Sequence, residues 1–175
     1  MKDENRLIDQ ILKGDSSSFS YFVKTYQDMA MTIAYRIFWN KTDAQDVVQN
    51  AFVKAYFNLH LFQKKSKFST WFYSIVYRIA ITEFQKKQHR REDLSDDFVE
   101  NTNLSFENNS NDRRELIEQA LRKLPKDEAM IISLYYLEDY SVKEINEIMS
   151  LTDSNVKIKL FRARQKLKEL LTLGE

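Results

Sequence analysis

The chain has 175 residues, of which 43% are hydrophobic, so it is long enough to form one ordinary domain or two small ones. Glycine and proline together account for only three residues, which argues against Rossmann, P-loop and most all-β folds, because their turns and phosphate loops require glycine. Without cysteine there is no disulfide, thiolate metal site or cysteine nucleophile. The scarcity of glycine and proline leaves an all-α protein as the expectation. His60 and His89 lack the spacing of paired helical ligands, so we expect no metal or other cofactor.

The N-terminal sequence MKDENRLIDQ lacks the apolar core of a signal peptide. No run of the chain approaches the roughly 18 uncharged apolar residues that a membrane-spanning helix needs. We therefore expect a cytoplasmic protein.

The net charge of +1 is distributed unevenly along the chain. Residues 92–112 contain seven acidic residues, no lysine or arginine and little apolar periodicity, which predicts a flexible acidic linker between two small helical domains. Residues 1–91 carry a net charge of +7, and residues 113–175 carry +1. Positive charge is concentrated over 64–91 and 154–168. Each run is a candidate phosphate-binding surface, although a basic helix face is often only solvated.

Apolar spacing predicts three helices in the first part of the chain. A short helix ends at Gly14, a long helix covers Phe19 to Ile37, and a third follows a capping box formed by Thr42 and Gln45. Taken alone, the polar face of the third helix is simply solvent-exposed. That face holds Asp43, Asp46, Gln49, Asn50 and Lys54, whereas the apolar stripe of the same helix includes Phe52.

The segment 62–91 interleaves lysine and arginine with aromatic residues. Part of the aromatic set has the spacing of a helix core, and Ser66 and Ser69 can cap that helix. The basic loop QKKSK precedes the helix and lies next to Phe62 in the sequence. Proteins hold single-stranded nucleic acid with such a combination, because cations follow the phosphates while rings or loop pockets receive unstacked bases. The segment therefore predicts a nucleic-acid surface.

The last third of the chain predicts a second helical domain. Asp112 and Glu115 can cap its first helix, and Pro125 suits the first position of the next one. Ser141 and Glu144 have the spacing of a capping box that opens a short helix.

A three-residue turn at 150–152 separates this short helix from a long basic helix that begins near Asp153. This is the layout of a helix-turn-helix, whose second helix lies in the major groove of DNA. An ordinary three-helix bundle is the alternative, because the turn lacks the glycine often found there. The residues of the second helix that lie outside its apolar stripe are Asn155, Lys157, Ile158, Lys159, Phe161 and Arg162.

Three ordered motifs make the chain similar to the extracytoplasmic-function (ECF) sigma factors of the sigma-70 family, the smallest class of bacterial transcription initiation subunits. Residues 43–52 resemble the helix that binds core polymerase, and residues 68–80 resemble the promoter-melting segment. Residues 124–149, followed by 156–164, resemble the reader of the upstream promoter element. The resemblance extends over essentially the whole chain.

The resemblance implies a dissociable, non-enzymatic subunit that binds core RNA polymerase, recognises promoter DNA and helps to open it. It implies a sigma region 2 bundle over 1–91, a linker over 92–112 and a sigma region 4 helix-turn-helix over 113–175. The implied partners are the clamp helices of the largest polymerase subunit, the flap of the second-largest subunit, promoter DNA and an anti-sigma factor, with no small-molecule substrate. The implied polymerase contacts are Asp43, Asp46, Gln49 and Phe52.

The same resemblance assigns residues to the two promoter elements. The loop 63–67 and the ring of Phe62 would capture a flipped base of the minus-ten element on the non-template strand. The minus-ten set is Phe62, Lys64, Lys65, Ser66, Lys67, Trp71 and Arg78. The minus-thirty-five set, which would contact duplex DNA, is Asn155, Lys157, Ile158, Lys159, Phe161 and Arg162.

Several residues depart from the family pattern. Arg78 stands where the family usually has asparagine, and Thr82 stands where it has aspartate. A guanidinium cannot reproduce the paired donor and acceptor of an amide. In the second domain Asn146, Asn155 and Lys159 replace the usual alanine, threonine and arginine. We therefore expect an unusual promoter sequence.

The alternative function is a stand-alone helix-turn-helix transcriptional regulator whose first domain binds a different partner. Such a regulator binds specific duplex DNA without polymerase and tolerates Asp46→Lys, whereas that charge reversal abolishes polymerase binding by a sigma factor. An enzyme is disfavoured because no carboxylate is paired with a base, a nucleophile or a glycine loop.

Overall fold

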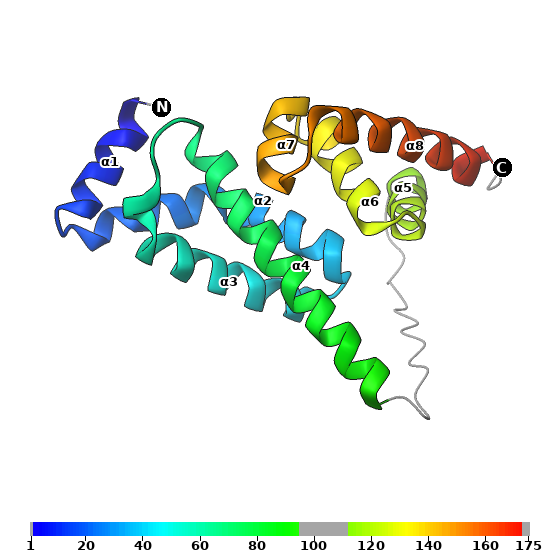
Figure 1. Ribbon diagram of the computed structural model, residues 1–175, viewed down its shortest axis with the longest axis horizontal. Helices are drawn as coiled ribbons and strands as arrows, with labels where there is room; N and C mark the ends of the chain where they lie inside the picture. The colour runs from blue at the N-terminus through cyan, green and yellow to red at the C-terminus, as the bar shows by residue number, and fades with distance from the viewer. Residues whose placement is uncertain (1, 95–111, 173–175) are drawn as a thin grey trace.

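The computed structural model describes residues 2–94 and 112–172, and every regular element in these two ranges is helical (Figure 1). This confirms the predicted all-α fold of two small domains. The residues expected to form the linker are largely outside the described ranges, although the last helix of the first domain continues to Leu94. The first domain contains α1 (Lys2–Leu12), α2 (Phe19–Phe38), α3 (Lys41–Phe57) and α4 (Phe68–Leu94), and the second contains α5 (Asp112–Lys123), α6 (Lys126–Ile132), α7 (Val142–Met149) and α8 (Asp153–Thr172).

Aromatic side chains form the centre of the first domain, where α2, α3 and α4 pack against one another. The rings of Phe52 and Phe72 stack with centroids 4.4 Å apart, and those of Phe22 and Phe68 are 4.3 Å apart. Phe22 and Phe72 are fully buried. Rings of this size remove a large apolar area from water, so this cluster accounts for much of the stability of the domain.

The turn between α2 and α3 differs from the sequence expectation. The predicted capping box of Thr42 and Gln45 is wrong, because α3 begins one residue before Thr42 and is capped by Asn40. The side-chain oxygen of Asn40 accepts a hydrogen bond from the backbone N–H of Asp43 at 3.0 Å. Trp39 precedes this cap in the left-handed conformation, at φ 53°. At the other end of α2, the predicted stop of the first helix at Gly14 is confirmed by the φ of that residue, 109°.

The second domain is built around buried aliphatic side chains from α6, α7 and α8. The capping box of Ser141 and Glu144 is confirmed at the start of α7. Pro125 is the N-cap of α6 rather than its first helical residue, one position from the expectation. A short π-helical turn, η3 (Ser133–Leu137), continues α6. The turn after α7 is made without glycine, because Ser150 itself adopts the left-handed conformation at φ 56°.

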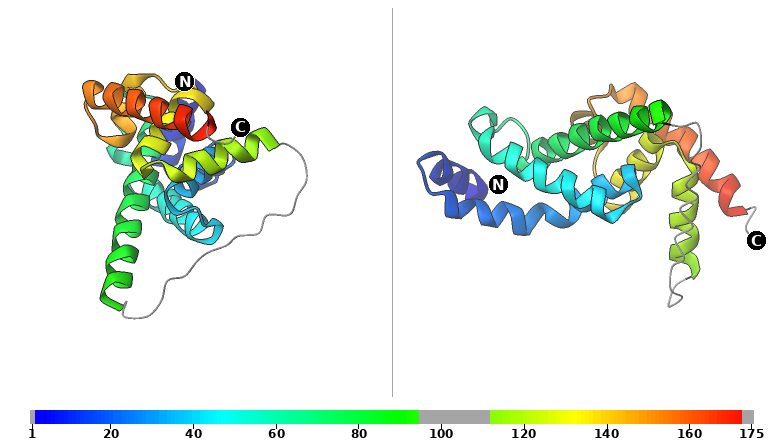
Figure 2. Two further views of the ribbon diagram at one scale, coloured as in Figure 1. Left: turned by 90° about the vertical axis from the view of Figure 1, so that its right-hand side faces the viewer. Right: turned by 90° about the horizontal axis from the view of Figure 1, so that it is seen from below.

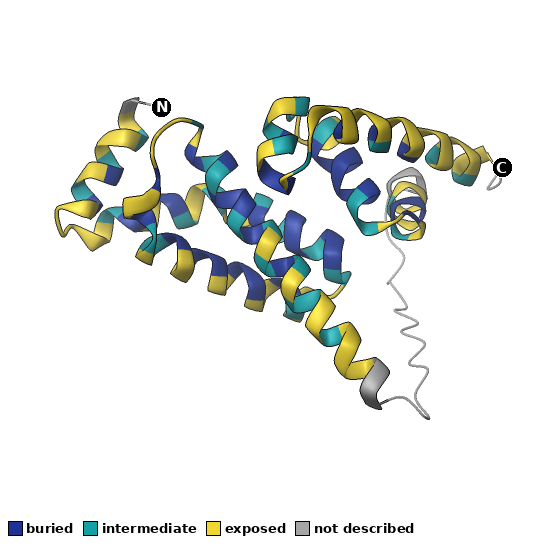
Figure 3. Cartoon of the chain, in the orientation of Figure 1, coloured by how far each residue is buried: buried dark blue, intermediate teal, exposed yellow. Residues whose placement is uncertain are grey.

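The two domains lie against each other, with α7 on α4 and α6 on α2 (Figures 1 and 2). Buried residues follow the inward faces of the helices, while the outer face of α8 is largely exposed (Figure 3). Among the described residues, no helix is both long enough and apolar enough to span a bilayer.

Candidate nucleic-acid and protein interfaces

The predicted minus-ten loop connects the short turn η2 (Leu59–Leu61) to α4. Phe62 at its start is only 8% exposed, and its ring packs against those of Phe68 and Trp71 at 5.8 and 5.2 Å. The ring therefore belongs to the core in this structure, and its expected capture of a flipped base remains a prediction. Trp71 is half-buried beside it.

The cations of the loop are at the surface, and two of them have carboxylate partners. Lys64, in the left-handed conformation at φ 57°, pairs with Asp9 at 2.5 Å. Lys67 pairs with Glu144 of the second domain at 2.7 Å. Lys65 is exposed. Ser66, between Lys65 and Lys67, is half-buried.

The two departures from the family pattern on α4 are next to each other on one turn. Arg78 is exposed, and its guanidinium donates to the hydroxyl of Ser74 at 3.2 Å. The hydroxyl of Thr82 donates back to the carbonyl of Arg78 at 2.8 Å. Arg78 therefore remains available on the surface of α4.

A pocket forms where the minus-ten region meets the second domain. Lys67, Ser69 and Tyr73 line it from the first domain, and acidic residues line it from the second. Burial raises the pKa of Tyr73, Tyr140 and Glu138. Burial also acts to raise the pKa of Glu144, but hydrogen bonds from Lys67 and Ser141 more than offset it, so that pKa is lowered. The acidic and aromatic residues of the second domain that line the pocket are Glu138, Asp139, Tyr140 and Glu144.

The predicted minus-thirty-five residues follow a helical stripe on α8. Val156, Leu160 and Ala163 are buried against the domain, so the intervening residues point outward. Ile158 and Phe161 are 48% and 60% exposed, so both apolar side chains lie on the outer face of α8. The other exposed members of the set are Asn155, Lys157 and Arg162.

Lys159 is the exception within this stripe. It is half-buried and forms an ion pair with Asp127 of α6. Its ammonium group is therefore directed at the domain itself, and its expected contact with DNA remains a prediction.

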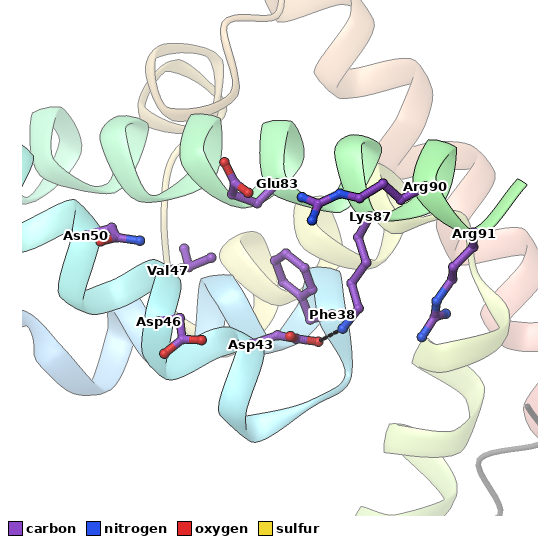
Figure 4. Close-up of a pocket in the computed structure, with 9 residues that line it drawn as sticks. All are labelled: Phe38, Asp43, Asp46, Val47, Asn50, Glu83, Lys87, Arg90 and Arg91. Carbon is purple, nitrogen blue, oxygen red and sulfur yellow. Dashed lines mark hydrogen bonds and ion pairs between the residues drawn. The ribbon is translucent and has the colours of Figure 1, made fainter. Parts of the chain in front are cut away.

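The exposed polar face of α3 carries the predicted polymerase contacts. Asp46 and Gln49 are exposed, while Asp43 is half-buried and pairs with Lys87 of α4 at 2.7 Å (Figure 4). Phe52 is only 8% exposed and stacks on Phe72, so it supports this face from the core, and its expected contact with polymerase remains a prediction.

Figure 4 also shows a groove beside this face that sequence reasoning missed. It lies between α3 and the second half of α4 and combines carboxylates with cations. The sequence signal was the basic run at 86–91, but only the fold shows that Lys87 of this run faces Asp43. The charged residues lining the groove are Asp43, Asp46, Glu83, Lys87, Arg90 and Arg91.

The structure brings together the expected residues of each surface, apart from the buried rings and Lys159. The sequence reasoning also missed the carboxylates that pair with the cations, because Asp9, Asp127 and Glu144 are far from their partners in the chain. The described residues contain no group of three potential ligands placed to hold a metal ion.

Both domains match known families. The family model described as Sigma-70 region 2 matches residues 22–90, and the one described as Sigma-70, region 4 matches residues 114–167. The ECF RNA polymerase sigma factor SigW of Bacillus subtilis is 30% identical over 181 residues, covering 94% of each chain. The ECF RNA polymerase sigma-E factor of Escherichia coli is 33% identical over 172 residues, covering 91% of this chain and 89% of that protein.

Solved structures share the fold. The sigma factor RpoE from Bartonella quintana, in complex with the anti-sigma factor NepR, superposes with a TM-score of 0.76 at 20% identity, covering 90% of this chain and 98% of that one. CnrH, in complex with the cytosolic domain of CnrY, gives a TM-score of 0.69 at 24% identity, covering 97% of each chain.

Proposed function

The chain belongs to the ECF sigma factors of the sigma-70 family, and on this premise we propose which of its surfaces perform the work of such a subunit. The face of α3 with Asp46 and Gln49 binds core RNA polymerase. The outer stripe of α8 reads the minus-thirty-five duplex. The loop 63–67 with the first turns of α4 holds the opened minus-ten strand.

The observation that best supports this proposal is the exposed stripe of α8. Its apolar members, Ile158 and Phe161, alternate with Lys157 and Arg162 on the helix that follows a tight turn. In a helix-turn-helix, this helix lies in the major groove, where an arginine or lysine can read guanine and apolar groups can contact the thymine methyl. A stripe that mixes cations with exposed apolar groups suits this environment better than it suits bulk water.

Two of the four residues expected to contact polymerase, Asp46 and Gln49, are exposed in this structure. Asp46 and Gln49 offer exposed acceptors, and Asp43 holds the neighbouring helix through Lys87. A helix face with a carboxylate and an amide is complementary to a partner that carries arginine or lysine. The partner proposed for this face is the clamp helices of the largest polymerase subunit.

Transcription by core polymerase, with and without the purified chain, tests the proposal. The expected result is a promoter-dependent product from a genomic template library that appears only with the chain. Asp46→Lys abolishes the product and the binding to core polymerase, whereas Asp28→Lys, a reversal at an exposed carboxylate of α2, preserves both. Absence of any product with the wild-type chain contradicts the proposal.

Non-enzymatic action and an anti-sigma partner are further parts of the proposal. The two solved structures described above are complexes, one with the anti-sigma factor NepR and one with the cytosolic domain of CnrY, which supports looking for a partner of this chain. Purification of the tagged chain from its own cells, followed by identification of what co-purifies, tests this expectation.

A stand-alone helix-turn-helix regulator is the second candidate, because the stripe of α8 is exposed without any polymerase present. Such a regulator binds specific duplex DNA alone and is indifferent to Asp46→Lys. The same two variants therefore separate the two functions.

A further inference from the structure

The middle of the minus-ten loop, residues 63–67, has a strained backbone. Lys64 adopts the left-handed conformation at φ 57°. This conformation disfavours a residue that carries a side chain, and it persists in a folded protein only where the surroundings hold it in place. Strain of this kind is frequent at binding sites, so the contacts that hold Lys64 bear on how the loop meets DNA.

A carboxylate of the first helix holds Lys64. The ammonium group of Lys64 donates to Asp9 of α1 at 2.5 Å, although the two residues are 55 positions apart. Figure 1 shows α1 beside the segment that leads from η2 to α4, and α1 contacts η2 directly. The loop is therefore held from outside by a helix that is far from it in the sequence.

The helix that carries Asp9 is itself firmly placed. Ile8 is fully buried and Ile11 is almost so, because the inner face of α1 belongs to the core of the first domain. The hydroxyl of Tyr26 on α2 donates to the carboxylate of Glu4, which attaches α1 a second time. Burial raises the pKa of Tyr26, and the bond to Glu4 adds to the effect, so the phenol keeps its proton as a donor at neutral pH.

The contact with Tyr26 also connects α1 to the start of α4. The ring of Tyr26 lies 5.3 Å from that of Phe68, the first residue of α4, and edge-on to that of Tyr73 at 5.9 Å. The two ends of the loop are fixed by the buried rings of Phe62 and Phe68, whose centroids are 5.8 Å apart. Asp9 holds the loop between these two ends.

We propose that α1 braces the minus-ten loop and that Asp9 is a positioning residue, which holds Lys64 so that the loop is shaped for a single DNA strand before the strand arrives. The assignment of the loop to that strand rests on the proposed function. A loop that is ordered in advance loses less conformational entropy on binding, so it binds the strand more tightly. Lys64 acts through the shape of the loop, whereas its exposed neighbour Lys65 is the cation offered to a phosphate.

The charge of Asp9 gives this inference a distinctive sign, because a carboxylate here lies beside a surface assigned to a polyanion. If Asp9 acted only as a nearby charge, its neutralisation would strengthen DNA binding by removing a like charge. If Asp9 positions the loop, its neutralisation weakens DNA binding despite the favourable change of charge. The two interpretations therefore predict opposite effects of Asp9→Asn.

Backbone relaxation of the full-length chain, measured by nuclear magnetic resonance, tests the brace without DNA. The amides of residues 63–67 in the wild-type chain should have order parameters of about 0.85, the value of a rigid backbone, and Asp9→Asn should lower them toward about 0.6. The matched control is Asp3→Asn, the same change at an exposed position of the same helix, which keeps the wild-type values. Equal order parameters in Asp9→Asn and Asp3→Asn overturn the brace.

Strand binding tests the consequence for DNA. The chain is assembled with core polymerase. The probe is a fluorescent single-stranded oligonucleotide with the non-template sequence just upstream of a transcript start mapped in the transcription experiment. Asp9→Asn should bind it about threefold more weakly than Asp3→Asn, on the scale of an exposed ion pair, and Asp9→Glu, which keeps the carboxylate, should bind like the wild-type chain. Equal or tighter binding by Asp9→Asn overturns the positioning role.

A double-mutant cycle shows whether Asp9 acts through Lys64. In a Lys64→Ala background the ion pair is already absent, so Asp9→Asn should cause no further loss of strand affinity. The same loss in that background would place the effect of Asp9 elsewhere and overturn the proposal. Circular dichroism confirms that each variant keeps its helices before its affinity is compared.

Failure of the proposed function is recognised separately. In that case the wild-type chain yields no transcript with core polymerase, and the part of the inference that concerns DNA falls with the proposed function. The order parameters of the loop still decide whether α1 holds it.

Discussion

The side-chain amide of Asn146 donates a hydrogen bond to the carboxylate of Asp153 at 2.8 Å, and this bond spans the turn between α7 and α8. The same residue supplies the backbone carbonyl that accepts from the N–H groups of Ser150 and Leu151. Asn146 therefore fixes the angle between the two helices of the helix-turn-helix by three hydrogen bonds. The side-chain bond of Asn146 thus adds a polar bridge between α7 and α8 to the two backbone bonds of the turn.

Replacement of Asn146 by alanine tests this bridge. Asn146→Ala is expected to be less stable than the matched control Asn155→Ala by about 1 kcal/mol, the value of a typical hydrogen bond. Both changes replace asparagine by alanine in a helix, but Asn155 is exposed whereas Asn146 donates to Asp153, so their difference reports mainly on that bond. Urea unfolding of the two variants provides the measurement, and equal stabilities exclude a structural role for the bridge.

The left-handed residue of the turn gives a second prediction. Ser150 has φ 56°, a conformation that costs a residue with a side chain about 1–2 kcal/mol and that glycine adopts readily. Ser150→Gly should raise the melting temperature and Ser150→Val should lower it, because a β-branched side chain is disfavoured most at positive φ. Thermal unfolding, monitored by circular dichroism, gives the melting temperatures of the two variants and the wild-type chain. A more stable valine variant would show that the turn takes another conformation.

Phe52 and Asp46 lie on the same helix but have different roles. Phe52→Ala removes a ring from the aromatic core and should cost about 3–5 kcal/mol of folding free energy. Asp46→Ala removes an exposed carboxylate and should change stability by less than about 0.5 kcal/mol while weakening polymerase binding. Chemical unfolding and pull-down with core polymerase separate the two effects. If Phe52→Ala folds with unchanged stability but no longer binds polymerase, Phe52 contacts polymerase directly.

Charge neutralisation on α8 gives a fourth prediction. Arg162→Ala should weaken binding to the minus-thirty-five duplex. If Arg162 contacts a phosphate, the slope of log affinity against log salt concentration should become shallower by about one. Arg164→Ala is the control on the same helix, because the guanidinium of Arg164 lies over the rings of Tyr135 and Tyr136 at 5.8 and 5.4 Å. Fluorescence anisotropy at several salt concentrations measures both slopes. If Arg162→Ala and Arg164→Ala lose the same amount of affinity for the duplex, the DNA binds elsewhere on the domain.

Alkaline pH should reveal the buried phenols. Burial raises the pKa of Tyr77 to about 12, with the carboxylate of Asp127 adding to the effect. A pKa raised by folding stabilises the folded state fully below the ordinary value of 10.0, and this contribution is lost as pH rises through the raised value. In an alkaline titration followed by phenolate absorbance, the wild-type chain should show an ionisation step near pH 12 that is missing in Tyr77→Phe. A Tyr77 that ionises with the exposed phenols would contradict its burial.

Much of the secondary structure could be predicted because it depends on neighbouring residues. The apolar spacing over Phe19–Ile37 matched α2 within one residue, and the capping box of Ser141 and Glu144 was confirmed. The cap of α3 could not be chosen with the same rule, since Asn40 and Thr42 both suit an N-cap. The left-handed Trp39 decides between them by turning the chain just before Asn40.

The surfaces were harder to predict than the helices. Spacing placed Phe52 and Phe62 near functional segments, but whether a ring is exposed depends on what packs on it from other helices. Lys159 likewise belonged to the outward residues by sequence and is held by Asp127 of α6. A cation and its carboxylate can be any distance apart in the chain, and no local pattern relates them.

By itself the sequence determined that this protein is helical, divided in two and basic on two segments, because helix formation, glycine content and charge are properties of residues and their near neighbours. Only the tertiary structure decided which of those charges meet solvent. The contact of Glu144 with Lys67 and of Glu118 with Arg36 depends on bringing residues from opposite domains within a few ångströms. Coulomb interactions and desolvation act at that range, so the packing of α7 on α4 decides the partner of Lys67, whereas Lys64 of the same loop pairs with Asp9 of the first domain.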